Sequence, residues 1–229
     1  MSVRQMKVGD EQNFVYLLVD EPSGEAMAID SGWEIDPILR AIRTERLDLK
    51  YAVATHHHSD HTATLWQLAR MFDTKVVAHR SSPISFDMGV DNGDALKIGE
   101  TEARILYTPG HSEDSICLYD GKHLFTGDTL LVGSCGRTDF TGGSPKQMFR
   151  SLHSVILKLP PETMFYPGHD YGEVPFRKLS IEARVNPALL ARSYKEFLAL
   201  LKSRANTHSP KPGFDYSGHG RRREGARFL

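Results

Sequence analysis

The chain has 229 residues, with 28 Lys or Arg against 29 Asp or Glu, so its formal net charge is −1. This length supports one sizeable domain or two small ones, and a near-neutral chain is not expected to be a strongly basic nucleic-acid binder. No apolar run approaches the roughly 20 residues that span a bilayer. No secretory signal is visible, and Cys117 and Cys135 are too few for a disulfide scaffold. We therefore expect a cytoplasmic protein that binds neither nucleic acid nor a membrane.

The first half of the chain alternates between strand-like and helix-like patterns. Apolar, β-branched and aromatic runs favour strands, whereas apolar residues three or four positions apart favour helices. We expect strands at residues 14–20, 25–30, 51–55 and 75–78, with a hairpin joining the first two. Helices are expected at residues 35–47 and 61–72. Residues 81–94, rich in Ser, Pro, Asp and Gly, are expected to form a loop.

The second half continues the alternation. We expect strands at residues 103–108, 116–119, 124–126 and 164–167, a Gly-rich loop at 127–143, and a helix at 145–159. A helical stretch at 179–201 should be interrupted at Asn186-Pro187. Helices between strands indicate a layered α/β (α+β) domain. We place it at residues 1–203, followed by a polar tail at 204–229 that carries Arg221, Arg222 and Arg223.

Histidine is the unusual residue, with 11 copies, several of them in one cluster. The stretch from Thr55 to His61 reads T-H-H-H-S-D-H. His56 and His58 are two positions apart at the end of a predicted strand, which places both imidazoles on one side of an extended backbone. Asp60 and His61 follow at once. Imidazoles and a carboxylate packed this closely are typical of half a metal site, whereas His57 faces the other way and is expected to be structural or to support a ligand.

Three further ligand-type residues follow later strands. His111 lies in T-P-G-H, Asp128 in F-T-G-D and His169 in Y-P-G-H-D, each beside a glycine that lets the backbone turn sharply. Alone, each would more often be a hydrogen-bonded or capping residue than a ligand. Together the seven residues suffice for two adjacent metals with one bridging carboxylate; they are His56, His58, Asp60, His61, His111, Asp128 and His169.

The motif H-x-H-x-D-H, followed in order by His111, Asp128 and His169, resembles the metallo-β-lactamase superfamily. The resemblance covers the chain from Met6 to about Asn186. It implies an αββα sandwich of two mixed β-sheets flanked by helices, with the metal site at the edge between the sheets.

Two branches of the superfamily are closest. The stretches C-G-R-T-D-F (from Cys135), Y-P-G-H-D-Y (from Tyr166) and R-x-N-P (from Arg184) resemble persulfide dioxygenases. Similar loops occur in glyoxalase II, the hydroxyacylglutathione hydrolases. Those enzymes usually carry a different pair at Thr138-Asp139 and a longer helical C-terminal domain, so the resemblance favours the dioxygenase. The stretch from His208 does not resemble the end of a persulfide dioxygenase.

The two branches imply different uses of the same residues. As a persulfide dioxygenase, the protein would hold one Fe(II) on His56, His111 and Asp128 and oxidise glutathione persulfide to sulfite. As a hydrolase of thioesters or lactones, it would hold two Zn(II). His56, His58 and His111 would then bind the first, Asp60, His61 and His169 the second, and Asp128 both. We expect His56, Asp60, His111 and Asp128 to be catalytic.

The resemblance also implies a substrate derived from glutathione. Paired hydrogen bonds suit Arg to the carboxylates of such a molecule, so Arg137, Tyr171 and Arg184 are the predicted substrate-binding residues. A structural ion pair with Asp139 is the alternative for Arg137, and packing in a loop is the alternative for Tyr171. A homodimer is a further expectation.

Overall fold

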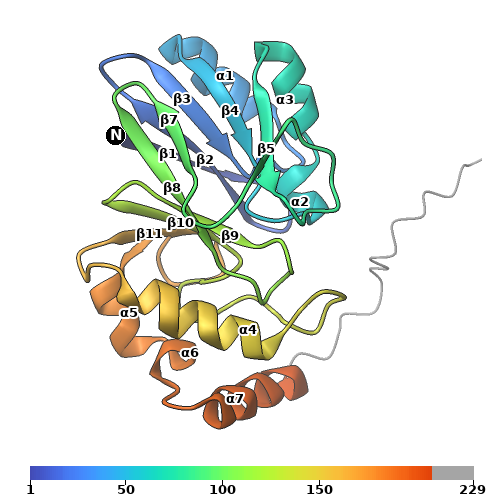
Figure 1. The fold of residues 1–229 in the computed structure, drawn as a ribbon, viewed down its shortest axis with the longest axis vertical. Coiled ribbons are helices and arrows are strands. Elements are labelled where there is room, and N and C mark those ends of the chain that lie inside the picture. The colour runs from blue at the N-terminus through green and yellow to red at the C-terminus, as the bar shows by residue number, and fades with distance from the viewer. Residues whose placement is uncertain (208–229) are drawn as a thin grey trace, which may run out of the picture.

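The computed structural model describes residues 1–207, and the side chains as far as residue 203. Two six-stranded sheets lie face to face, with strand orders β1-β2-β3-β4-β5-β6 and β12-β11-β10-β9-β8-β7. Helices cover the outer face of each sheet (Figure 1). The fold is therefore the predicted αββα sandwich.

The first sheet and its helices are formed by the N-terminal part of the chain. Its strands are β1 (Ser2–Val8), β2 (Asn13–Asp20), β3 (Glu25–Ile29), β4 (Asp48–Val53), β5 (Lys75–His79) and β6 (Met88–Val90). Strands β1 to β3 pair antiparallel and β3 to β6 pair parallel. Helices α1 (Asp36–Glu45) and α3 (Leu65–Phe72) pack on its outer face through Ile38, Ile42, Leu65 and Leu68. The short helix α2 (Ser59–Thr62) precedes α3.

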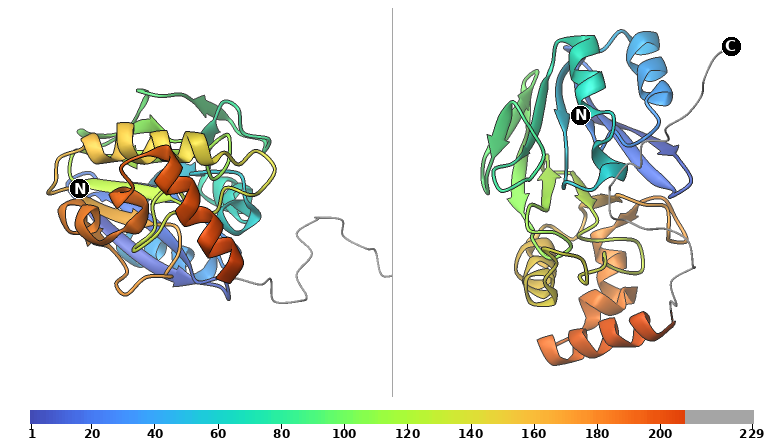
Figure 2. Two further views of the ribbon diagram at one scale, coloured as in Figure 1. Left: turned by 90° about the horizontal axis from the view of Figure 1, so that it is seen from below. Right: turned by 90° about the vertical axis from the view of Figure 1, so that its right-hand side faces the viewer.

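The second sheet is formed by the C-terminal part. Its strands are β7 (Ala95–Ile98), β8 (Thr101–Tyr107), β9 (Ile116–Tyr119), β10 (His123–Gly127), β11 (Met164–Pro167) and β12 (Arg177–Lys178). Helices α4 (Pro145–Arg150), α5 (Leu179–Val185), α6 (Pro187–Leu190) and α7 (Tyr194–Thr207) lie on its outer side (Figure 2). Met148, Leu179 and Phe197 from these helices pack against Leu124 and Phe165 of the sheet.

Strand β2 shows how the sequence specifies the sandwich. All eight of its residues are buried, and alternate side chains point to opposite faces. Val15, Leu17 and Val19 enter the core under α1 and α3, whereas Tyr16 and Leu18 enter the core between the sheets. An apolar run without polar alternation therefore marks a strand covered on both faces.

Some elements differ from the sequence-based expectations. No strand was predicted at β1, β6, β7 or β12, and β6 interrupts the loop expected at residues 81–94. The predicted helix at 61–72 is divided between α2 and α3, where Thr64 donates its backbone N–H and its hydroxyl to the Ser31 carbonyl. The predicted helix at 145–159 is regular only to Arg150 and continues as a π-helical turn (Ser151–Val155) and a short 3-10 helix (Ile156–Lys158).

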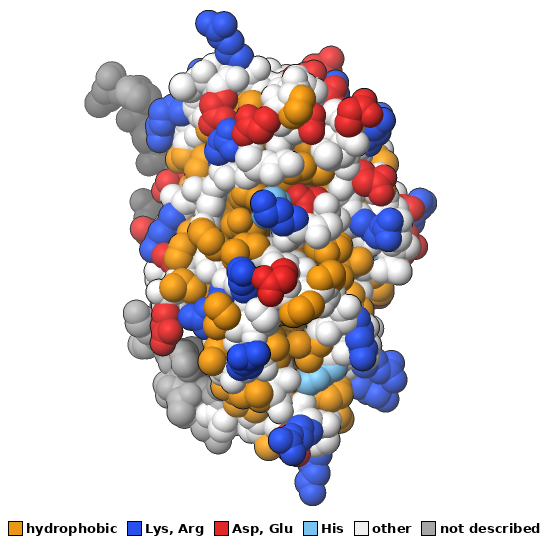
Figure 3. Space-filling model, turned by 90° about the vertical axis from the view of Figure 1, so that its left-hand side faces the viewer, with side chains coloured by type: hydrophobic (Ala, Val, Ile, Leu, Met, Phe, Trp, Pro, Cys, Tyr) orange, Lys and Arg blue, Asp and Glu red, His pale blue; other side chains and the backbone are white. Residues whose placement is uncertain are grey.

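The C-terminal boundary stays a prediction. Helix α7 runs through the expected division between residues 203 and 204, and residues 208–229, with Arg221, Arg222 and Arg223, lie outside the described residues. No helix in the described part of the chain is long and apolar enough to cross a membrane. The face in Figure 3 mixes apolar side chains with charges of both signs, as the near-neutral net charge suggests.

Candidate metal centre

The structure brings together all seven predicted ligand residues, which come from four separate segments. His56, His58, Asp60 and His61 follow β4, His111 lies between β8 and β9, Asp128 follows β10 and His169 follows β11. Their ligand atoms form three overlapping groups, each within 4.8 Å: His56, His58 and His111; His56, His61 and Asp128; and Asp60, His61 and His169. Strands β3 to β5, and likewise β10 and β11, run parallel, so these carboxyl ends meet at one edge of the sandwich.

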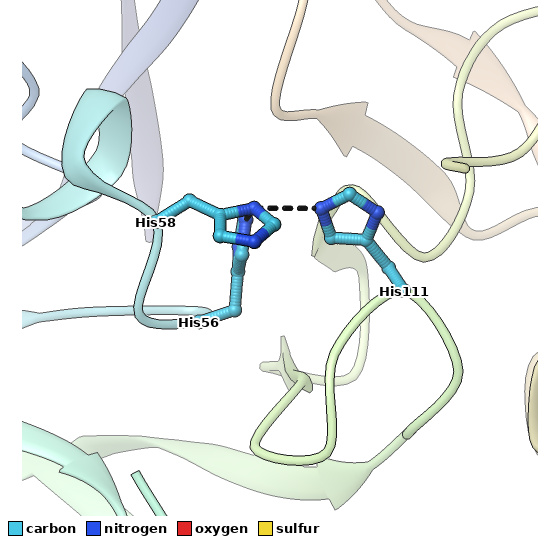
Figure 4. Close-up of side chains that lie close together, drawn as sticks. All are labelled: His56, His58 and His111. Carbon is cyan, nitrogen blue, oxygen red and sulfur yellow. Dashed lines mark hydrogen bonds between the residues drawn. The ribbon is translucent and has the colours of Figure 1, made fainter. Parts of the chain in front are cut away.

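We define the first half of the centre as His56, His58 and His111. The Nδ1 atom of His58 lies 3.0 Å from Nε2 of His56 and 2.9 Å from Nε2 of His111. The three rings point toward one another from two different loops (Figure 4). The ring of Phe140 lies beside this half, with its centroid 5.2 Å from that of His58 and 5.5 Å from that of His111.

We define the second half as Asp60, His61 and His169. The Oδ2 atom of Asp60 lies 3.3 Å from Nε2 of His61 and 3.4 Å from Nε2 of His169, and the two Nε2 atoms are 3.3 Å apart. Four ligands placed tetrahedrally at about 2.0–2.1 Å from zinc are themselves about 3.3 Å apart. The second half therefore has the spacing that one tetrahedral cation requires.

Asp128 lies between the two halves. Its Oδ2 atom is 3.5 Å from Nε2 of His111 and 3.4 Å from Nε2 of His169, and its Oδ1 atom is 3.7 Å from Nε2 of His61. Oδ1 is buried and has no hydrogen-bond partner among the described residues. A buried carboxylate oxygen without a donor is costly, and a cation between the halves would satisfy it.

Four imidazoles are oriented through their outer nitrogens. Nδ1 of His111 donates to the Arg137 carbonyl (2.8 Å), and Nδ1 of His169 donates to the Glu11 carbonyl (3.0 Å). Nδ1 of His61 lies 3.0 Å from Oδ2 of Asp30, and Nδ1 of His56 lies 3.2 Å from the hydroxyl of Thr55. Each contact leaves the opposite nitrogen, Nε2, facing the cluster, which is how metal-binding histidines are usually held.

Asp30 supports both halves at once. It follows β3 and is almost fully buried, and it accepts hydrogen bonds from the backbone N–H (2.7 Å) and the hydroxyl (2.8 Å) of Thr55. Because that hydroxyl donates to Asp30, it can accept from His56, while Asp30 contacts His61 directly. Asp30 was not predicted from the sequence, although a polar residue directly after the apolar end of β3 was a usable signal.

The first half favours neutral imidazoles. Burial, followed by the neighbouring His111 and His57, lowers the pKa of His58 to about 4. Burial is also the main reason that the pKa values of His56 and His111 lie below the ordinary value, and nearby imidazoles act in the same direction. Neutral imidazoles carry the lone pairs that a metal needs.

The second half favours charged side chains, with protonated histidines facing ionised carboxylates. Burial alone would lower the pKa of His169, yet Asp128 and Asp60 raise it to about 9. Asp30 and Asp60 likewise raise the pKa of His61 against the effect of burial. Burial opposes the ionisation of Asp60 and Asp128, but the facing histidines hold the pKa of both carboxyls below the usual value.

The donor set and its surroundings fit divalent cations. Five imidazole nitrogens and two carboxylates suit zinc or ferrous iron, and the orphaned oxygen of Asp128 lies between the halves. Gly168 makes room for the site, because a Cβ at this position would lie 2.5 Å from Oδ1 of Asp128 and 2.8 Å from Cε1 of His61. The ligand role of each residue stays a prediction.

The three predicted substrate-binding residues lie in different places. Arg137 is exposed, forms two hydrogen bonds of 2.9 Å to Asp139, and lies 4.5 Å above the ring of Phe140 beside the first half. Tyr171 is half exposed and stacks on His169 at 4.6 Å. Arg184 is exposed on α5, and within the described residues no contact joins it to the cluster.

A groove of about 720 Å³ begins at Tyr171 and continues past Val132, Arg177 and Ile181. Two of the residues that line it, Gly133 and Arg177, are held by Glu182, which is fully buried. Glu182 accepts hydrogen bonds from the Gly133 backbone (2.6 Å), the side chain of Asn186 (2.7 Å) and Arg177 (3.2 Å). Asn186, in the R-x-N-P stretch, also donates from Nδ2 to the carbonyls of Leu131 (3.2 Å) and Ser134 (2.9 Å) in the loop after Asp128.

Comparisons with known proteins agree with this geometry. Residues 8–169 match the family model of the metallo-beta-lactamase superfamily, which is well over half of the chain. The chain belongs to the metallo-β-lactamase superfamily. The relatives named below carry the names of enzymes, and the predicted assignment as a metal-dependent enzyme is confirmed.

The similarity extends over nearly the whole chain. The chain is 35% identical to the mitochondrial persulfide dioxygenase ETHE1 of Homo sapiens, over 92% of this chain and 83% of that protein. The solved structure of ETHE1 from Myxococcus xanthus is 34% identical, with a TM-score of 0.85 and 93% of each chain covered. A hydroxyacylglutathione hydrolase of Bdellovibrio bacteriovorus is 30% identical, over 85% of this chain and 94% of that protein. Both predicted branches are thus represented among the relatives.

Proposed function

We propose that this protein is a persulfide dioxygenase that oxidises glutathione persulfide at one ferrous iron. The similarity to ETHE1 over more than nine tenths of the chain is the observation that carries the proposal. In this reaction one dioxygen and one water are consumed for each persulfide, and one sulfite, one glutathione and two protons are released. The outer sulfur is oxidised, dioxygen is reduced, and the sulfur–sulfur bond is broken.

The iron ligands in this proposal are His56, His111 and Asp128. Two imidazoles and a carboxylate on one face of ferrous iron leave positions open for dioxygen and for a substrate sulfur. The short contacts of His58 with both imidazoles would then orient them. Asp60, His61 and His169 would hold water and protons near the reacting sulfur.

Two side chains are suitably placed to bind the glutathione part. Arg137 lies beside the first half and Tyr171 stacks on the second, so the substrate would lie between them. The guanidinium of Arg137 can exchange Asp139 for a substrate carboxylate, because both side chains are about two-thirds exposed. Arg184 would act only on a distant part of the substrate.

The alternative is a dinuclear zinc hydrolase of glutathione thioesters or lactones. The tetrahedral spacing of the second half favours this function, because a mononuclear oxygenase does not require it. Asp128 would then bind both metals, which together would activate a water molecule for attack on the thioester carbonyl.

His58→Ala separates the two functions. The iron-loaded variant should retain most of its oxygen uptake with glutathione persulfide, whereas hydrolysis of a hydroxyacylglutathione by the zinc-loaded variant should be lost. Metal analysis should give about one iron per chain for the dioxygenase and about two zinc for the hydrolase. His57→Ala controls for the loss of an imidazole outside the cluster, since His57 contacts Asp114 at 2.8 Å. No oxygen uptake by the iron-loaded wild type would refute the proposal.

A cytoplasmic location and a homodimer remain parts of the proposal. Fractionation of cells and the mass of the purified protein in solution test them.

A further inference from the structure

One turn of the chain contacts the second half of the centre from outside. Residues 9–12 connect β1 to β2, with Gly9 and Gln12 both at positive φ, and together with Asn13, the first residue of β2, they form the segment that we call the 9–13 turn. The turn is hydrogen-bonded to the loop after β11. The Phe14 N–H donates to the Gly168 carbonyl (2.8 Å), and the Asp170 N–H donates to the Gln12 carbonyl (2.8 Å). The loop that carries His169 is thereby paired with the N-terminal hairpin.

Two contacts from this turn reach the predicted ligands themselves. The Glu11 carbonyl accepts the Nδ1 proton of His169 at 3.0 Å. The side chain of Asn13, which is only 2% exposed, donates from Nδ2 to Oδ2 of Asp60 at 2.9 Å. The same oxygen lies 3.3 Å from Nε2 of His61 and 3.4 Å from Nε2 of His169. The turn therefore fixes the orientation of two of the three ligand groups of the second half.

The first half is oriented by other groups. His56 contacts Thr55, and His111 donates to the Arg137 carbonyl. Among the described residues, the 9–13 turn makes no hydrogen bond to His56, His58 or His111. The 9–13 turn therefore acts on the second half only, although Asp30 supports both halves and Asp128 lies between them.

We propose that the 9–13 turn is a positioning element that sets the divalent-cation affinity of the second half alone, and that Asn13 is its decisive side chain. Partners that orient metal ligands commonly change metal affinity by about 10–100-fold when they are removed. The inference rests on the proposed metal centre. It requires that the second half can hold a divalent cation, although the proposed dioxygenase reaction would use only the iron on His56, His111 and Asp128.

Cobalt titration of the metal-free protein tests this proposal, because Co(II) reports each binding step by its absorption. The wild type should bind two Co(II) per chain. In Asn13→Ala, the second Co(II) should bind about 10–100-fold more weakly while the first is unchanged. Asn13→Ser, which keeps a hydrogen-bond donor, should recover part of the loss. Gln12→Ala is the matched control, because the Gln12 side chain is exposed and contacts Lys7 rather than a ligand.

Equal weakening of both steps, or of neither, would overturn the proposal, and so would a wild type that binds a single Co(II) at saturation. If Asn13→Ala does not fold, Asn13→Ser decides, because its second site should still bind Co(II) more weakly than the wild type does. A second site of wild-type affinity in Asn13→Ser, or an equal loss in Gln12→Ala, would contradict the assignment. Failure of the proposed function is distinguishable: it would show as absent oxygen uptake in an iron-loaded wild type that still binds two Co(II).

Discussion

The two halves of the candidate centre use the same residue type in opposite ways. In the first half, three histidines lie among one another and an aromatic ring, and burial keeps the imidazoles neutral. In the second half, two histidines face the carboxylates of Asp30, Asp60 and Asp128, which favour the protonated form. The difference shows that a shared edge of the sandwich can provide neutral donors and a charged pocket within a few ångströms. A cation at the first half would therefore meet a different electrostatic environment from a cation at the second.

The largest loss of metal binding and activity is expected for Asp128, because this residue does not belong to one half alone. This residue faces both halves, so Asp128→Asn should weaken metal binding in each and lower activity on the order of 10³-fold or more, about 4 kcal/mol. The change is nearly isosteric and therefore tests the charge. Metal content per chain and turnover with glutathione persulfide are the measurements.

Asp91→Asn is the matched control, because Asp91 is an exposed aspartate whose nearest imidazole is that of His79, outside the centre. An Asp128→Asn protein with full metal content and turnover would show that the two halves are not connected through this carboxylate.

The second prediction concerns the stability of the metal-free protein as the pH changes. Burial alone would lower the pKa of His169, but Asp128 and Asp60 raise its folded value from 6.5 to about 9. A raised folded pKa stabilises the protein fully below the unfolded pKa, and this stabilisation is lost as the pH rises through the folded value. The free energy of unfolding should therefore fall by on the order of 3 kcal/mol between about pH 6.5 and 9.

The first half should show the opposite slope. The pKa of His58 is lowered to about 4, so its contribution is lost as the pH falls from about 6.5 toward 4. Urea unfolding in the presence of a chelator measures both slopes. His169→Asn should reduce the alkaline slope and leave the acidic one, with His61, whose pKa is also raised, supplying the remainder. An alkaline slope that is unchanged in this variant would assign it to other groups.

The sequence was sufficient to find the seven clustered residues because each is marked locally. A turn-forming glycine or a tight histidine motif follows an apolar strand in every case, and strand ends gather at one edge of a layered sheet. Asn13 and Asp30 were missed because their roles depend on distant residues. Asn13 contacts Asp60, 47 positions away, and Asp30 contacts His61, 31 positions away.

The fold was predicted in outline for a similar reason. Long apolar runs such as β2 identify central strands, whereas β1, with Arg4, Gln5 and Lys7, has too little apolar character to predict a strand. The end of regular α-helix at Arg150 is a tertiary effect. The Ser151 hydroxyl donates to the Pro109 carbonyl at 2.7 Å, and a local helical pattern does not contain that contact.

The smallest expected effect is a change in KM. It tests whether the substrate contacts the protein beside the first half of the centre. Arg137→Ala removes the guanidinium beside the first half but keeps the backbone carbonyl that orients His111. KM for glutathione persulfide should therefore rise by the equivalent of about 1–3 kcal/mol, the value of a hydrogen bond to a charged group, while kcat and metal content stay nearly constant. Because the pair with Asp139 is exposed, its loss should cost at most about 1 kcal/mol of stability.

Asp139→Ala is the matched control, since it removes the partner of Arg137 and leaves the guanidinium able to bind substrate. KM should stay the same or fall in this variant. An unchanged KM in Arg137→Ala would limit the role of Arg137 to its carbonyl group. In that case Tyr171→Ala, on the other half, becomes the decisive variant, because a substrate that does not contact Arg137 would have to approach over the ring stacked on His169.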